Sequence, residues 1–284
     1  LAHGYSGCRA EVVESLLALL ARDVTPVVPL EGSVGASGDL APLAHLAAVI
    51  TGEGEAWLGD KRMPAALALR GAGLQPLELE AKEGLALING TQLSAALAVL
   101  ACVDAQRVWE AALAASALST EVLLGSVAPA REEVQRLRAY PGALEAARRT
   151  RAYAEGSALV ASHVDCDRVQ DAYSLRCVPQ VMGASWDALD HVGRQLEIEL
   201  NSVNDNPLVF AAEGDIISGG NFHAEQVAMA ADTLALALAE IGSLAERRIA
   251  LLIDADMTGL PPFLVDNGGL NSGFMIAQVT AAAL

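Results

Sequence analysis

The residues with the most unusual chemistry lie in a glycine-rich loop, Gly32-Ser33-Val34-Gly35-Ala36-Ser37-Gly38-Asp39. Glycine at every third position allows tight backbone reversals that other residues resist. In the triplet Ala36-Ser37-Gly38, the Gly38 nitrogen can attack the carbonyl carbon of Ala36, because glycine has no side chain to obstruct the approach. Loss of water from that ring and from the Ser37 side chain would leave a methylidene. Such a group is a strong electrophile built only from the chain itself.

The position of this loop in the chain favours the same chemistry. Apolar residues at helical spacing from Leu43 to Ile50 predict an amphipathic helix, with Asp39 as its N-cap and Pro42 in its first turn. A helix N-terminus offers unpaired N–H groups and the positive end of the helix dipole. Negative charge that develops on the loop is therefore favoured there.

Two other interpretations of the loop need to be weighed. A phosphate-binding loop is excluded, because the sequence lacks Gly-x-x-x-x-Gly-Lys-Ser/Thr and Gly-x-Gly-x-x-Gly here and has no lysine between Arg22 and Lys61. A plain flexible turn before a capped helix is compatible with the residues alone. The loop is therefore either a connector or a site of backbone cyclisation.

A second group of polar residues, Gln170-Asp171-Ala172-Tyr173-Ser174-Leu175-Arg176-Cys177, interrupts an otherwise apolar chain. The guanidinium of Arg176 is a planar fork that can hold a carboxylate by two hydrogen bonds. The alternative is an ordinary intramolecular salt bridge. This segment is the second candidate site.

The run Thr25-Pro26-Val27-Val28-Pro29, followed by Gly32 to His45 of the loop and its helix, resembles the signature of the aromatic amino acid ammonia-lyases, most nearly the histidine ammonia-lyases. The resemblance covers essentially all 284 residues. It implies that Ala36, Ser37 and Gly38 cyclise into 4-methylidene-imidazol-5-one. Asp39 would assist that cyclisation, cap the helix, or do both. No metal and no external cofactor is expected, since the histidines show no metal-ligand spacing.

The resemblance also assigns roles to residues outside the loop. Arg176 would bind the substrate carboxylate, Tyr173 would lie near the prosthetic group, and Gln170 matches an active-site glutamine. Asn89, which alone would be a turn residue, would lie beside the ring. Phe222, otherwise a core aromatic at a helix start, would pack against the ring.

The implied reaction is a non-oxidative α,β-elimination of ammonia from an aromatic amino acid, which for histidine gives trans-urocanate. An aminomutase of the same family is an alternative that these motifs do not separate. A non-catalytic helical assembly core is a second alternative. The family's tyrosine base would precede residue 1 and a substrate-contacting glutamate would follow Leu284. We therefore expect this chain to be weakly active or inactive.

Composition predicts an all-α chain. Hydrophobic residues make up 53% of the sequence but aromatics only 4%, and the abundant alanine and leucine favour helices over strands. The periodicity predicts a long-helix bundle, with helices over 91–124, 179–203 and 221–253, a small hairpin over 208–218, and a short hairpin or an irregular excursion over 53–61. We expect one helical domain over residues 1–284, truncated at both ends.

Charge and cysteine content limit the partners. With 35 acidic and 18 basic residues, the net charge of −17 argues against a nucleic-acid or anionic membrane surface. Asp104, Arg107 and Glu110 interrupt the apolar stretch 93–124, so no membrane span is expected. The excess of apolar helix predicts a homo-oligomer, and the resemblance implies a tetramer. Four cysteines without Cys-x-x-Cys spacing favour reduced thiols and a cytoplasmic location.

Overall fold

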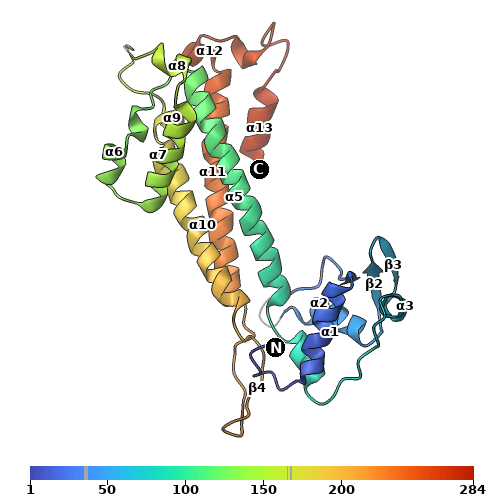
Figure 1. Ribbon diagram of the computed structural model, residues 1–284. Coiled ribbons are helices and arrows are strands. Elements are labelled where there is room, and N and C mark those ends of the chain that lie inside the picture. The colour runs from blue at the N-terminus through green and yellow to red at the C-terminus, as the bar shows by residue number, and fades with distance from the viewer. Residues whose placement is uncertain (35–37, 165, 167) are drawn as a thin grey trace. The chain divides into compact units, whose positions relative to one another are not determined.

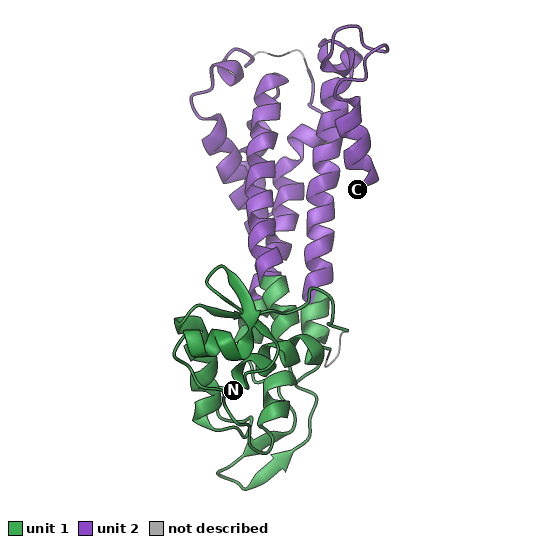
Figure 2. Cartoon of the chain, turned by 90° about the vertical axis from the view of Figure 1, so that its right-hand side faces the viewer, with its two compact units in different colours: residues 1–99, 195–229 green, residues 100–194, 230–284 purple. Residues whose placement is uncertain are grey.

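The computed structural model describes residues 1–34, 38–164, 166 and 168–284. The chain forms two compact units (Figure 2), of which unit 1 is Leu1–Val99 with Gln195–Met229 and unit 2 is Leu100–Arg194 with Ala230–Leu284. Three long helices supply residues to both units: α5 (Gln92–Val122), α10 (Val178–Leu200) and α11 (Glu225–Ile253). Since these helices are continuous, no linker marks the division in the sequence. That residues 1–284 form one domain stays a prediction.

Unit 1 combines short helices with two small antiparallel sheets. Its helices are α1 (Ala10–Ala21), α2 (Leu40–Ile50), α3 (Ala65–Gly71) and α4 (Glu83–Ile88). One sheet has the order β1 (Val24–Pro26), β2 (Glu55–Leu58) and β3 (Lys61–Pro64), and the other pairs β4 (Leu208–Phe210) with β5 (Asp215–Ile217). Trp57 pairs with Thr25 on one side and with Arg62 on the other.

A hydrophobic core joins the helices of unit 1 to the first sheet. Val12 and Leu19, seven residues apart on α1, lie on one face of that helix and pack with Ile50, Ala56 and other buried residues from α2 and β2. This core fixes α2, and with it the end of the glycine-rich loop.

Unit 2 is a helical bundle. Parts of α5, α10 and α11 run side by side (Figure 1). The shorter elements are η1 (Ala128–Ala130), α6 (Glu132–Arg136), α7 (Pro141–Ala154), α8 (Ala158–Ala161), α9 (Tyr173–Arg176), α12 (Ala255–Thr258), η2 (Pro262–Leu264) and α13 (Met275–Ala283).

A tryptophan pair holds α5 against α10 inside unit 2. Trp109 is fully buried, donates its Nε1–H to the carbonyl oxygen of Met182 at 2.7 Å, and meets the Trp186 ring at a centroid distance of 4.5 Å. The Arg149 guanidinium from α7 lies over both rings at 5.3 and 5.4 Å. These contacts give the bundle a packed, partly polar seam.

Two glycines bring α7 and α10 into backbone contact. A Cβ on Gly142 would lie 2.0 Å from the carbonyl oxygen of Gly183, and a Cβ on Gly183 would lie 2.4 Å from the Ala143 nitrogen. Only glycine fits at either position, because any side chain would force the two helices apart.

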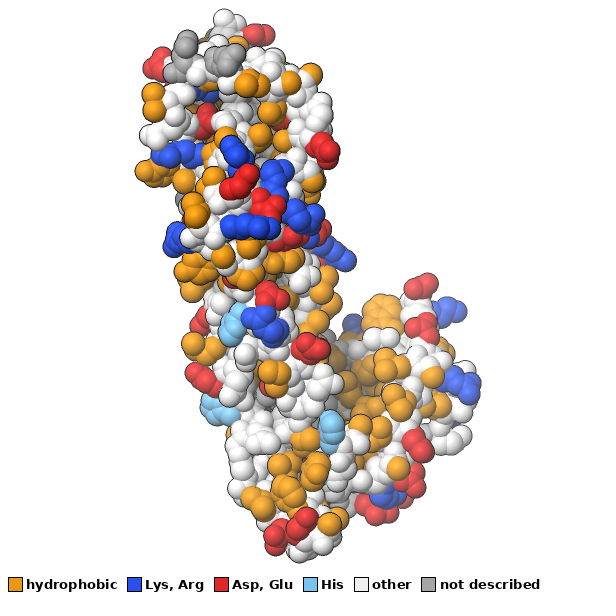
Figure 3. Space-filling view, turned by 60° about the vertical axis from the view of Figure 1, so that its left-hand side comes forward, with side chains coloured by type: hydrophobic (Ala, Val, Ile, Leu, Met, Phe, Trp, Pro, Cys, Tyr) orange, Lys and Arg blue, Asp and Glu red, His pale blue; other side chains and the backbone are white. Residues whose placement is uncertain are grey.

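The surface of unit 2 carries ion pairs between neighbouring turns of helix. Glu145 accepts from both Arg148 and Arg149 at 2.7 Å, and Arg149 also pairs with Glu110 at 2.9 Å. Figure 3 shows acidic and basic side chains side by side among exposed apolar ones. Because such pairs neutralise one another locally, the net negative charge of the chain is not concentrated there.

Two helical stretches, Glu83–Val122 and Glu225–Ile253, are long and apolar enough to cross a membrane by length and composition alone. Charged residues interrupt both stretches, among them Arg107 in the first and Glu240 in the second, and the expectation of no membrane span stays a prediction. Core helices of soluble proteins meet the same criterion, and the two most apolar windows are 44% and 33% buried inside this structure.

The all-α class and the long helices are confirmed. The helices predicted over 91–124, 179–203 and 221–253 appear as α5, α10 and α11, and hairpins form in both of the remaining segments, as β2–β3 and as β4–β5. The sequence interpretation missed strand β1, because three residues containing a proline give no strand periodicity. All four cysteines are free thiols.

Candidate active site

The glycine-rich loop is closed at its base by a backbone hydrogen bond. The Val34 N–H donates to the Gly38 carbonyl oxygen at 3.2 Å, and Gly38 itself is buried. Gly35, Ala36 and Ser37 lie outside the described residues, so the predicted cyclisation of Ala36-Ser37-Gly38 stays a prediction. The described part of the loop brings Val34 and Gly38, on either side of those residues, into contact.

Asp39 stands at the N-cap position of α2, but its carboxylate does not cap that helix. Its backbone carbonyl accepts from Leu43 N–H at 2.9 Å, whereas its side chain makes no cap bond to any described residue of α2. Its φ of −82° and ψ of 5° depart from the extended conformation that lets an N-cap side chain reach back to its own helix. Asp39 is therefore the N-cap residue of α2 by position, as predicted, but not by a side-chain hydrogen bond to that helix.

The Asp39 carboxylate instead joins the loop to the start of α5. It is 1% exposed and accepts from Ser33 Oγ at 2.6 Å, Ser94 N–H at 2.8 Å and Ser94 Oγ at 2.8 Å. Ser94 is the third residue of α5, so the carboxylate satisfies one of the unpaired N–H groups at that N-terminus. Asp39 thus fixes the loop to the first turn of a 31-residue helix.

Asn89 lies three residues before the start of that same helix, at the C-terminus of α4. Its side chain is buried, with the residue 7% exposed. Its backbone N–H donates the last hydrogen bond of α4 to the Leu85 carbonyl at 2.9 Å, and its Nδ2 donates to the Asn206 carbonyl at 2.9 Å. No described residue donates to its side-chain oxygen. The bond to Asn206 therefore orients the amide and leaves Oδ1 as an acceptor.

The segment Asn204-Asp205-Asn206 supports this region, a role that the sequence interpretation missed. Asp205 pairs with Lys82 at 2.7 Å, and Asn204 donates to Thr91 Oγ1 at 2.6 Å. The Asn206 side chain accepts from the Gly219 N–H at 2.7 Å. The sequence analysis placed this run only between the helix over 179–203 and the hairpin over 208–218. The available signal was three consecutive hydrogen-bonding residues before a proline.

Phe222 lies in the turn before α11 and is half-buried. The neighbouring Asn221 donates its Nδ2–H to the Val203 carbonyl at 3.0 Å, which ties this turn to the segment that follows α10. The prediction that Phe222 packs against a ring formed by the loop stays a prediction.

The remaining candidate residues, Gln170, Tyr173 and Arg176, belong to unit 2. Tyr173 and Arg176 are the first and last residues of α9, a single turn that places both side chains on one face. The Arg176 guanidinium lies 4.7 Å from the centroid of the Tyr173 ring, and no carboxylate among the described residues pairs with it. Tyr173 is 71% exposed, and Gln170 is exposed.

Arg176 and Gln170 line a cavity of about 530 Å³. Two buried polar atoms there have no partner among the described residues, Arg176 Nε and His163 Nε2. Asp171 holds the segment in place, since its carboxylate accepts from the Ser126 N–H at 2.7 Å and lies 3.8 Å from Arg168. His163 was missed as a lining residue, because a lone histidine in a polar stretch carries no signal of its location.

The structure therefore groups the predicted residues into two sets. Gly38, Asp39, Asn89 and Phe222 belong to unit 1, where Asp39 is bonded to Ser94 in the first turn of α5 and Asn89 ends α4. Gln170, Tyr173 and Arg176 form the set in unit 2. Within the described ranges, no three His, Cys, Asp or Glu side chains gather as a metal site would require.

The whole chain is similar to known proteins in sequence and in structure. The family described as "Aromatic amino acid lyase" matches residues 1–284. Histidine ammonia-lyases of Burkholderia pseudomallei (strain 668) and Burkholderia cenocepacia (strain HI2424) are each 57% identical over 284 residues, which is 100% of this chain and 56% of theirs. The chain thus spans little more than half the length of these relatives.

Solved structures show the same fold. Histidine ammonia-lyase from Trypanosoma cruzi is 43% identical with a TM-score of 0.85, and the match covers 99% of this chain and 52% of that one. Pantoea agglomerans phenylalanine aminomutase is 36% identical with a TM-score of 0.89, covering 99% and 57%. With a family match over its whole length, this chain belongs to the aromatic amino acid lyases.

Proposed function

We propose that the chain is the core of an ammonia-lyase that converts L-histidine to trans-urocanate by non-oxidative elimination of ammonia. The observation that carries this proposal is the 57% identity to histidine ammonia-lyases across the whole chain. The site supports it, because buried Asp39 anchors the end of the glycine-rich loop to the start of α5.

The residues around the loop fit a prosthetic group made from Ala36, Ser37 and Gly38. The hydrogen bond between Val34 and Gly38 restricts the two ends of the loop. Asp39, the residue after Gly38, is bonded through its carboxylate to Ser94 of α5. A 4-methylidene-imidazol-5-one formed there supplies an electrophile that a protein side chain cannot offer. No metal or external cofactor is needed for that chemistry.

The chain's own side chains would bind and orient the substrate. Arg176 offers its guanidinium to the carboxylate of the substrate. Its buried Nε has no hydrogen-bond partner among the described residues, so a substrate would displace none of them. Asn89 offers the oxygen of an amide whose orientation is fixed by Asn206. Gln170 lines the same cavity as Arg176, and the Tyr173 ring stacks on the Arg176 guanidinium.

We propose a cytoplasmic homotetramer, with no nucleic-acid or membrane partner. Large apolar side chains remain exposed on the long helices of unit 2, among them Leu100 (64%), Leu118 (60%) and Leu236 (73%). Helices with this much apolar surface are normally covered by another chain. Sedimentation should show an oligomer, and a stable monomer at micromolar concentration would contradict the proposal.

The test of activity is product formation from histidine, and from phenylalanine and tyrosine for comparison. The ultraviolet absorbance of the conjugated acid measures the product. We expect histidine to be preferred and turnover to be slow, because a positioned general base contributes about 10²–10⁴-fold. Ser37→Ala removes the electrophile and should abolish even the slow reaction. If Ser37→Ala releases product as fast as the unmodified chain, the proposed chemistry is wrong.

An aminomutase is the second candidate, favoured by the match to the Pantoea agglomerans enzyme. The same assay distinguishes the two. A β-amino acid accumulating from phenylalanine or tyrosine would indicate the mutase, whereas ammonia release in step with the unsaturated acid would indicate the lyase. An unmodified protein mass and no product of either kind would favour a non-catalytic assembly core.

A further inference from the structure

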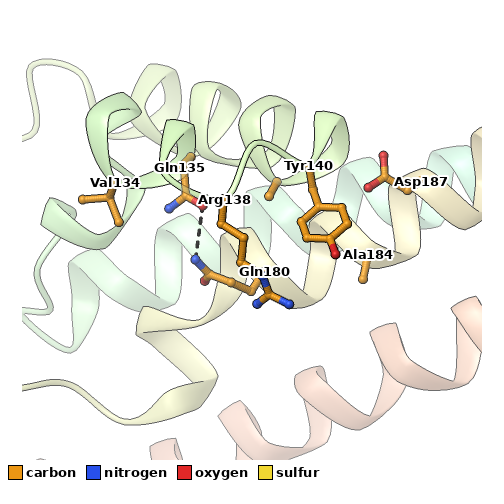
Figure 4. A pocket seen from close by; sticks show the side chains of 8 residues that line it. Val134, Gln135, Arg138, Tyr140, Gln180, Ala184 and Asp187 are labelled. Atoms are coloured by element: carbon orange, nitrogen blue, oxygen red, sulfur yellow. Dashed lines mark hydrogen bonds between the residues drawn. The ribbon is translucent and has the colours of Figure 1, made fainter.

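Unit 2 holds another cavity, of about 420 Å³, that none of the proposed catalytic residues lines (Figure 4). Its walls come from α6, from the turn into α7, and from α10. The backbone contact of Gly142 with Gly183 fixes the spacing of α7 and α10 beside it. The cavity is therefore built between elements with little freedom to close it.

Arg138 supplies a positive charge to this cavity. Its neighbours Arg131 and Arg136 are paired with Glu133 and Glu132, whereas no described carboxylate pairs with Arg138. Its guanidinium instead lies 5.2 Å from the centroid of the Tyr140 ring. In a chain with nearly two acidic residues for each basic one, an arginine without a described carboxylate partner is available for a ligand anion.

The same combination occurs at the proposed substrate site. Arg176 lies over the Tyr173 ring, also without a described carboxylate partner, and also lines a cavity with a glutamine and an aspartate. Both arginines stand beside the ring of a tyrosine close in sequence, which holds the guanidinium by cation–π attraction while leaving its N–H groups available. The second cavity thus repeats the chemistry of a carboxylate site.

The amides of the second cavity are oriented by a hydrogen-bonded chain. Gln135 is 2% exposed and donates its Nε2–H to the Pro129 carbonyl at 2.7 Å, so its Oε1 accepts from Gln180 Nε2 at 3.1 Å. Figure 4 shows this bond beside the Arg138 guanidinium. Gln180 is thereby oriented in the cavity that Arg138 also lines.

Asp187 places a negative charge elsewhere in the same cavity. Its Oδ1 accepts from the Gly142 N–H at 2.8 Å, and no described donor bonds to Oδ2. Figure 4 shows the Tyr140 ring between Arg138 and Asp187, with Ala184 alongside. The cavity therefore offers a cation, a flat aromatic surface and a carboxylate.

We propose that this cavity binds a planar carboxylic acid with a hydrogen-bond-donating nitrogen at its far end, the carboxylate on Arg138 and the nitrogen on Asp187. Trans-urocanate has this chemistry, so naming it as the ligand rests on the proposed function. The cavity would then bind the product away from the residues that form it.

The test is isothermal titration calorimetry of the 284-residue chain with trans-urocanate. Arg138→Gln should weaken binding at this cavity about tenfold or more, because a charge-assisted contact is lost. Ala184→Leu, which adds bulk at an exposed position, should weaken it without changing any charge. Arg136→Gln is the matched control, since Arg136 lies two residues away in a surface ion pair, and should change affinity by less than about twofold.

Arg176→Gln separates this inference from the proposed function. Binding that survives Arg176→Gln and is lost in Arg138→Gln supports the second site, whether or not the chain turns over histidine. If no urocanate binds, or if Arg138→Gln binds as the unmodified chain does, the inference is overturned while the proposed function stands. Cinnamate, which lacks the nitrogen, should bind more weakly than urocanate, and equal affinity would overturn the role of Asp187.

Discussion

The two sets of candidate residues are held in opposite ways. Asp39 and Asn89 in unit 1 are almost fully buried, and Asp39 accepts three hydrogen bonds. Tyr173 in unit 2 is 71% exposed, and Arg176 Nε has no partner among the described residues. Because buried polar groups are normally satisfied, the hydrogen bonds of the first set stabilise the fold, whereas Arg176 Nε has no such bond to a described residue. Mutations should therefore affect stability in unit 1 and binding in unit 2.

Asp39→Ala should have the largest effect on stability. It leaves the Ser33 hydroxyl and both donors of Ser94 without their shared acceptor, which should lower the free energy of unfolding by about 3 kcal/mol. Urea unfolding measures this loss. Asp39→Ala should also reduce the fraction of chains that cyclise, because the loop is no longer anchored. Intact mass measures that fraction, since each cyclised chain has lost two waters.

Glu14→Ala is the matched control for Asp39→Ala, because Glu14 is exposed on α1. It should change stability by less than about 0.5 kcal/mol. An Asp39→Ala chain as stable as Glu14→Ala, with the same mass loss, would contradict the idea that unit 1 is organised around this carboxylate.

Glu83→Gln tests unit 1 through its pH dependence. Glu83 is 1% exposed and accepts from the Arg9 guanidinium at 2.8 Å and the Glu80 N–H at 2.7 Å, and these bonds, Arg9 foremost, lower the pKa of Glu83 from 4.5 to about 2. Since the pKa is lower in the folded chain, the stabilisation is complete above pH 4.5 and is lost as the pH falls toward about 2.

At neutral pH, Glu83→Gln should therefore cost about 2 kcal/mol. The difference from the unmodified chain should shrink as the pH is lowered through this range, because the protonated Glu83 resembles glutamine. Urea unfolding at several pH values measures it. A cost that does not change with pH would mean that the charge of Glu83 contributes nothing.

Arg176→Gln should affect binding rather than stability. Loss of the guanidinium should weaken the binding of substrate carboxylate about tenfold, equivalent to about 1.4 kcal/mol, and leave the unfolding midpoint almost unchanged. Arg194→Gln, which breaks an exposed ion pair with Asp190 on α10, is the control and should change neither. A large loss of stability in Arg176→Gln would show that this arginine is structural.

The long helices were predictable, because apolar spacing persists over many turns of α5, α10 and α11, and their ends were wrong by only a few residues. Strand β1 was not, since Thr25 is a strand residue only through its pairing with Trp57. The partner of Asp39 was equally hidden, because Ser94 lies 55 residues away in sequence. A carboxylate before a helix predicts a cap, but only the tertiary fold decides which helix it caps.

Ser94→Ala should have the smallest effect, and it separates the contribution of the Ser94 hydroxyl from that of the Ser94 N–H in holding Asp39. The change removes the Ser94 Oγ bond to Oδ1 but keeps the Ser94 N–H bond to Oδ2 and the Ser33 Oγ bond, so Asp39 still joins the loop to α5. We expect a loss of about 1 kcal/mol in urea unfolding and an unchanged mass loss from cyclisation. Ser15→Ala, which removes only a hydroxyl bonded within α1, is the control and should cost less than about 0.5 kcal/mol. If Ser94→Ala were as damaging as Asp39→Ala, the hydroxyl rather than the helix N–H would be the anchor, and the loop would depend on one side-chain pair instead of on the start of α5.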